Sequence, residues 1–149
     1  YDPKHELIVR DYIERLINTP SDDYRIIEQD MYKIMLEILE EKRVLNTVPS
    51  LEEKKGKDYL LAQLQKIATQ EAFLARMKYE PHERGDVIFL TGIGKVYPFM
   101  RSHKMLDSMQ QVFSDIPIVM FYPGEFNGQS LSLFDKFHDG NYYRAFNLL

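Results

Sequence analysis

Two short apolar runs, residues 87–90 and 116–122, constrain the fold of this chain more than any other feature. Residues 87–90 are too few for a helix, and a strand that is apolar on both faces is typical of a parallel sheet covered by helices on both sides. Between the two runs, residues 97–113 repeat apolar side chains at helical spacing. The order strand, helix, strand predicts a βαβ unit with a right-handed crossover.

The rest of the chain extends this pattern. Apolar periodicity predicts helices over residues 3–17, from about 31 to 39, and over 58–77, with a short strand at 24–28. The polar stretch 46–57 is expected to be a surface loop, 131–134 a short strand or turn, and 142–149 an aromatic tail packed on the domain. We therefore predict one α/β domain, 1–149, with three layers and a mostly parallel sheet of P-loop-like or Rossmann-like type.

Composition limits the chemistry. The chain has no Cys, so neither a disulfide nor a thiolate metal site can form, and its four His residues are scattered without a His-x-x-x-His pair. We expect no metal and no cofactor. No segment approaches the roughly 20 apolar residues of a membrane span. The net charge of −4 disfavours direct nucleic-acid binding, which needs clustered Lys and Arg.

A glycine-containing loop, residues 91–95, follows the first apolar run. Gly92 and Gly94 could let backbone amides approach a phosphate, with Lys95 as the counter-charge. The spacing fits neither phosphate-binding motif: Phe89 stands where GxxxxGK[ST] needs its first Gly, and Tyr97 stands at the last Gly of GxGxxG. The favoured alternative is a tight turn between strand and helix.

Further along, Arg101 could grip an anion and His103 could act as an acid or base. Asp107 lies four residues after His103, so a plain pair on the helix surface is the favoured alternative.

Two later segments are polar or aromatic. Residues 123–130 follow the second apolar run, at the end of a strand where open α/β sheets bind ligands. They form either a recognition loop or a turn whose side chains cap one another. Residues 139–146 place Arg144 among Tyr and Phe, as an interface anchor or as core closure.

Motifs in these segments resemble the BrxB family of bacteriophage exclusion (BREX) systems. The resemblance rests on residues 89–94, 97–103, 121–131 and 141–146, in that order, and on the opening 1–4. It implies a small cytoplasmic component of an antiviral complex, with a PglZ-type phosphatase-like protein and the BREX ATPase as expected partners. It also implies a degenerate P-loop-like fold, an apolar strand before the first helix, and a fragment that lacks this strand. It supplies no catalytic residues.

We therefore expect a non-catalytic interaction module rather than an enzyme. The alternatives are a degenerate nucleotide-binding regulator or cryptic enzyme with its ligand near residues 92–95, and, as the weakest, a DNA-contacting subunit. The expected partner or ligand surface comprises Gly92, Gly94, Tyr97, Pro98, Arg101, His103, Pro123, Gly124, Glu125, Asn127, Gln129, Tyr142, Tyr143 and Arg144.

Overall fold

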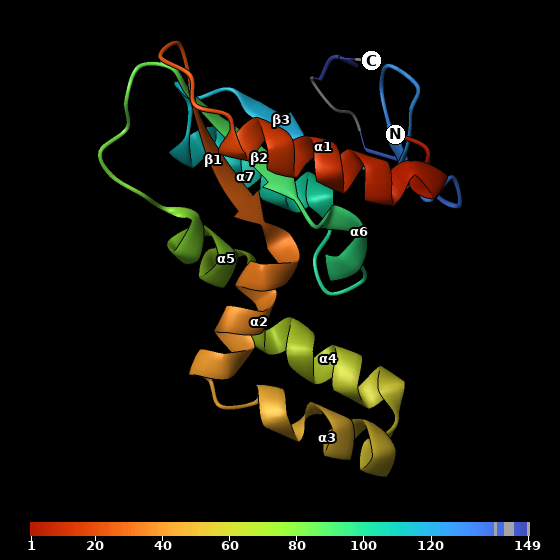
Figure 1. The fold of residues 1–149 in the computed structure, drawn as a ribbon. Coiled ribbons are helices and arrows are strands. Elements are labelled where there is room, and N and C mark those ends of the chain that lie inside the picture. Colours follow the sequence, from red (N-terminus) through yellow and green to blue (C-terminus); the bar gives the residue numbers. More distant parts are fainter. Residues whose placement is uncertain (139, 142–144, 149) are drawn as a thin grey trace.

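A three-stranded parallel sheet forms the centre of the protein. A computed structural model describes residues 1–138, 140–141 and 145–148. Strands β1 (Arg25–Asp30), β2 (Asp86–Thr91) and β3 (Ile118–Met120) lie in the order β1-β2-β3. In Figure 1, helix α1 (Glu6–Asn18) crosses one face of this sheet and α7 (Ser102–Val112) lies behind the other. The predicted mixed α/β class and the parallel βαβ unit are confirmed.

The first helices begin where the sequence predicts. The Asp2 side chain accepts a hydrogen bond from the Lys4 amide, and a 3-10 turn, η1 (Pro3–His5), leads into α1. The carboxylate of Asp30 caps α2 (Met31–Glu41) in the same way, accepting from the amides of Tyr32 and Lys33. Such caps satisfy amides that have no partner within the helix.

Residues 46–57 are not the predicted surface loop. A 3-10 turn, η2 (Leu45–Thr47), is followed by helix α3 (Val48–Lys55). Proline is tolerated in the first helical turn, where Pro49 stands, and the following Glu and Lys residues favour a helix. Gly56, with φ of +82°, ends the helix.

The single helix predicted over 58–77 is also wrong. Two helices occupy this stretch, α4 (Lys57–Ile67) and α5 (Gln70–Met77). The chain leaves helical geometry at Ala68, and the hydroxyl of Thr69 then accepts a hydrogen bond from the Ala72 amide. A side-chain cap in the middle of a periodic stretch therefore starts a new helix.

The helix predicted over 97–113 is shorter than expected. A four-residue helix, α6 (Ile93–Val96), follows β2, and α7 begins only at Ser102. Pro98 lies in the turn between them, because a proline inside a helix would lose a backbone hydrogen bond.

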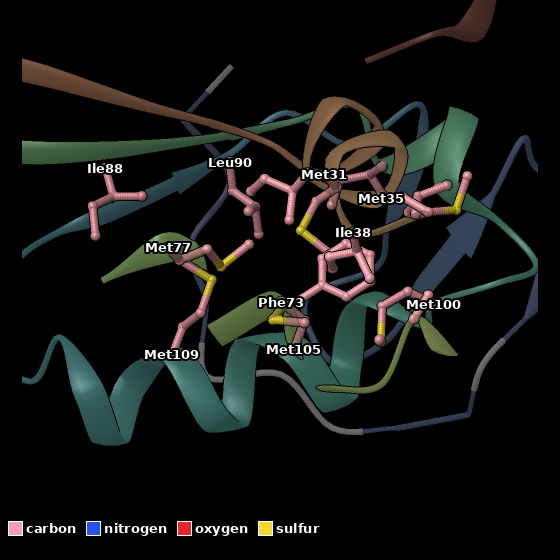
Figure 2. Close-up of a cluster of buried hydrophobic side chains, with 14 of the residues drawn as sticks. Met31, Met35, Ile38, Phe73, Met77, Ile88, Leu90, Met100, Met105 and Met109 are labelled. Carbon is pink, nitrogen blue, oxygen red and sulfur yellow. The ribbon is translucent and has the colours of Figure 1, made fainter. Parts of the chain in front are cut away.

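The main core lies between the sheet and helices α2, α4, α5 and α7, and it is rich in methionine. Figure 2 shows Ile88 and Leu90 of β2 facing Phe73, Met77, Met105 and Met109, all of them completely buried or nearly so. Methionine is flexible and fills irregular gaps between helices that meet at different angles. On the other side of the sheet, Ile13 of α1 and Phe89 of β2 are buried outside this cluster.

A second sheet follows β3 and is antiparallel. Strands β4 (Gly124–Phe126), β5 (Leu131–Leu133) and β6 (Phe137–His138) pair in the order β4-β5-β6. The strand expected near 131–134 is thus present, but part of the expected loop 123–130 is strand β4. Within the described ranges, no helix combines the length and apolar character needed to cross a bilayer.

Candidate functional site

The candidate site is the edge of the parallel sheet where β1 and β2 end and the chain leaves β3. We call this edge, with the adjoining second sheet, the carboxyl edge. Asp30 ends β1, Thr91 ends β2, and residues 121–124 continue from β3. Open α/β sheets bind ligands at this position. Inside the edge, the Thr91 hydroxyl donates a hydrogen bond of 2.9 Å to Glu28 Oε1.

The glycine loop packs against the cap of α2. Gly92 has φ of +72°, and a Cβ atom built on it would lie 2.3 Å from Asp30 Oδ1 and 3.0 Å from the Tyr32 nitrogen. Only glycine fits this close approach. The Asp30 carboxylate, held by the α2 amides, therefore lies beside the loop where a phosphate would need space and positive charge.

The positive charge of Lys95 already interacts with other groups of the protein, which would compete with a phosphate. Its Nζ lies 5.9 Å from the centre of the Tyr32 ring, a cation–π distance, and its charge also lowers the pKa of Glu6. Helix α6, which begins at Ile93, has only four residues and so provides little helix dipole for an anion.

The structure brings the glycine loop and the exit of β3 together. A Cβ atom on Gly94 would lie 2.9 Å from both Pro123 Cγ and Phe134 Cζ. A Cβ atom on Gly124 would lie 2.0 Å from the backbone oxygen of Ser132, across the β4–β5 pair. Gly94 and Pro123, one residue from each segment of the predicted surface, are thus in contact, and the role of both is close packing.

The β4–β5 turn is built on Asn127. Its Oδ1 accepts from the amides of Gln129 (3.0 Å) and Ser130 (2.8 Å), and its Nδ2 donates to Ser130 Oγ. This is the arrangement of a turn whose side chains cap one another. Glu125 and Gln129 remain exposed and project polar groups from the second sheet.

Of the other predicted surface residues before and in α7, Tyr97 is the one that contacts the second sheet among the described contacts. The Tyr97 ring lies 5.0 Å from Phe137 of β6, and the carbonyl of Pro98 accepts a hydrogen bond from Gln65 Nε2. Arg101 is exposed just before α7. His103 Nε2 lies 3.2 Å from Asp107 Oδ2, the surface pair expected from the spacing. Tyr142, Tyr143 and Arg144 lie outside the described residues.

Tyr1 also belongs to this edge, and sequence reasoning missed it. Its main-chain nitrogen donates to the Tyr122 carbonyl, and its own carbonyl accepts from the Gly124 amide, both at 2.9 Å. The Tyr1 hydroxyl donates to Glu6, which also binds Arg10 at 2.7 Å. Burial raises the pKa of Glu6, but the hydrogen bonds from Tyr1 and Arg10 outweigh burial and lower it. Burial, reinforced by Glu6, raises the pKa of Tyr1.

A second polar cluster, also missed, lies at the opposite end of the strands. The buried Asp86 carboxylate accepts from Arg25 Nε (2.7 Å) and Nη2 (2.8 Å), from the Tyr79 hydroxyl (2.8 Å) and from the Glu83 amide (2.9 Å). These hydrogen bonds, above all from Arg25, hold the pKa of Asp86 well below its usual range. Burial and the bond to Asp86 raise the pKa of Tyr79 to about 12.

The donors around the Asp86 carboxylate all form hydrogen bonds to it, as is usual for a buried polar group. We therefore interpret the cluster as structural rather than reactive. An acidic residue at the start of an apolar run was the signal available in the sequence. Among the residues that the structure describes, no group of three His, Asp or Glu side chains could hold a metal ion.

The geometry defines a class of protein: an α/β domain whose carboxyl edge is filled by its own Asp30 cap and by a small antiparallel sheet. The particular family follows from comparison with known proteins. The family model described as "BREX protein BrxB" matches residues 27–148. The chain therefore belongs to the BrxB family, and the resemblance predicted from the motifs is confirmed.

Two curated relatives carry the same description. "BREX protein BrxB" of Bacillus cereus (strain H3081.97) is 41% identical over 156 residues, covering 100% of this chain and 80% of the relative. The protein of that description from Escherichia coli O9:H4 (strain HS) is 31% identical over 152 residues, covering 100% of this chain and 75% of the relative. No solved structure gives a significant match.

Proposed function

We propose that this chain is a non-catalytic interaction subunit of a BREX antiviral system. It binds another component, first of all a PglZ-type phosphatase-like protein and second the BREX ATPase, through the outer surface of the carboxyl edge. Membership of the BrxB family supports the placement in phage defence.

The proposal that this chain is non-catalytic rests on one observation. The place where α/β sheets bind ligands is occupied by the chain's own groups: the Asp30 carboxylate lies against Gly92, and Pro123 and Phe134 lie against Gly94. A bound phosphate would have to displace or face a carboxylate, which is unfavourable. Two open hollows on the surface lie elsewhere, lined by residues 80–82 and by residues from 16–26 and 83–84.

The proposal that this chain binds a partner rests on the polar side chains that are exposed at its surface. Glu125 and Gln129 are exposed on a second sheet that holds its shape by hydrogen bonds of its own, and Arg101 is exposed just before α7. Polar groups on a rigid support are suited to partner recognition, since little side-chain or loop ordering remains to be completed on binding.

Co-purification with the PglZ-type protein tests the proposal. Glu125→Arg reverses an exposed charge at this surface, and Glu53→Arg makes the same change on α3, far from it in Figure 1. We expect Glu125→Arg to lower the recovered complex at least tenfold and Glu53→Arg to leave it unchanged, with both variants keeping the wild-type circular dichroism spectrum. Equal recovery with both variants would contradict the proposed surface.

Nucleotide binding is the outcome that would favour the alternative of a degenerate regulator. Thermal unfolding is measured with and without millimolar ATP, GTP and their diphosphates. A ligand that binds only the folded state raises the unfolding temperature. We expect no shift, and a shift abolished by Lys95→Ala would contradict the non-catalytic proposal.

A further inference from the structure

Helix α1 exposes three large apolar side chains on the side that faces away from the sheet. Leu7, Ile8 and Tyr12 are 76%, 68% and 59% exposed. The buried residue of this helix, Ile13, lies on the opposite side, toward the sheet that α1 crosses (Figure 1). Single apolar side chains are normal on a protein surface, whereas a contiguous group of them marks a site of interaction.

The apolar group lies between two opposite charges. Lys4, Leu7, Ile8 and Asp11 are all exposed, and their spacings of three and four residues place them on one stripe of the helix. The described ion pairs of this helix do not include Lys4, and Asp11 shares only Oδ2, with Arg15 at 2.7 Å. The stripe therefore has an apolar centre, a cation toward the start of the helix and an anion one turn further along.

This stripe is complementary to itself when two copies of α1 run antiparallel. A two-fold axis between Leu7 and Ile8 makes residues at equal distances from the axis face one another. Leu7 then faces Ile8 of the second copy, and Lys4 faces Asp11 of the second copy. A parallel pair would instead place like charges side by side, which is unfavourable. A two-fold interface uses the same patch on both copies, as this arrangement does.

We propose that the outer face of α1 binds the same face of a second copy of this chain, with the two helices antiparallel. Leu7 and Ile8 of both copies form the apolar centre, and a Lys4–Asp11 ion pair closes each end. The charge complementarity of the stripe with itself favours a second copy over an unlike partner. The proposal does not rest on the proposed function, which concerns the carboxyl edge.

The dimer is expected to be weak. The contact is one helix wide, so its total area falls at the small end of specific interfaces, below about 1,200 Å², where complexes are transient. Sedimentation velocity of the full-length protein is therefore measured over a wide concentration range. We expect monomer and dimer to be equally populated at roughly 10–100 µM.

Two single variants test the apolar centre. Ile8→Asp introduces a charge at a side chain that is already 68% exposed, so the monomer is expected to keep its fold. Glu53→Arg on α3 is the control for a charge change at an exposed position of another helix. We expect Ile8→Asp to remain monomeric at every concentration and Glu53→Arg to associate like the wild type, with unchanged circular dichroism spectra for both.

An exchange of charges tests the antiparallel register. Lys4→Glu and Asp11→Lys should each weaken association at least fivefold, because every dimer contains the altered pair twice. The double variant Lys4→Glu/Asp11→Lys should regain association to within about twofold of the wild type, because the opposite charges again face one another.

Three results would overturn the proposal. The first is a wild-type protein that stays monomeric, including the case in which Ile8→Asp instead lowers co-purification with the PglZ-type protein and so assigns the face to an unlike partner. The second is association that Ile8→Asp leaves unchanged. The third is a double variant that associates no better than the single charge variants.

Discussion

Replacing Asp86 with Ala tests whether the buried cluster holds β1 and β2 in register. The two strands begin with the pair Arg25 and Asp86, and the carboxylate is the shared acceptor for Arg25, Tyr79 and the Glu83 amide. Without Asp86, the Tyr79 hydroxyl and the Glu83 amide lose their acceptor inside the structure. A buried donor left unpaired costs about 1–3 kcal/mol.

Arg25 adds less to the loss, because its side chain is 40% exposed and keeps Glu83 at 3.1 Å. We therefore expect Asp86→Ala to lower the free energy of unfolding by about 3 kcal/mol. Tyr79→Phe removes one of the bonds and should cost about 1.5 kcal/mol. Since the two residues share a bond, the double variant should lose less than the sum of the single losses.

Urea unfolding of the four proteins measures these differences. Asp107→Ala is the matched control, because its carboxylate also has a side-chain partner, His103, but is 62% exposed, and exposed pairs contribute at most about 1 kcal/mol. A loss below about 1 kcal/mol for Asp86→Ala, or losses that simply add in the double variant, would refute the reasoning.

Two further predictions concern pH and a glycine. The pKa of Asp86 is lower in the folded state than its unfolded value of about 3.9, so the ionised carboxylate contributes its full stabilisation above about pH 4 and loses it as the pH falls further. Urea unfolding between pH 5 and 3 should therefore show a steeper fall in the free energy of unfolding for wild type than for Asp86→Asn. Equal slopes would contradict this. Gly124→Ala should cost about 2–3 kcal/mol, because its Cβ would meet the Ser132 oxygen at 2.0 Å. Gly128→Ala, with open space around its Cβ, should cost only about 1 kcal/mol for its positive φ, and equal losses for both variants would contradict the clash.

Some of the candidate site could be read from the sequence, and some could not. The pairing of His103 with Asp107 follows from helix spacing, and the capping role of Asn127 follows from turn chemistry. The contact between Gly92 and the Asp30 carboxylate joins residues 62 positions apart, and nothing local to either residue encodes it. The same holds for Tyr1 beside Pro123, since strand pairing depends on the path of the whole chain.

The sequence by itself determined the two strands of the βαβ unit, the class of the fold and the family, although the second strand, Ile118–Met120, is shorter and less buried than predicted. Strand β2 and α2 were predictable because a repeating apolar pattern directly reflects which faces of an element are buried. The same pattern could not reveal the break at Thr69, where a side-chain cap competes with helix continuation, or the helix over residues 48–55, which lacks a strong apolar stripe.

Tertiary structure alone decided how these elements meet. It placed Asp30 beside the glycine loop, so that a sequence resembling a fragment of a phosphate loop becomes a packed turn. It also brought Tyr1 beside the chain that leaves β3, where Tyr1 bonds to Tyr122 and Gly124. The physical reason is the same in both cases: local propensity sets the type of an element, whereas its neighbours are set by contacts between distant parts of the chain.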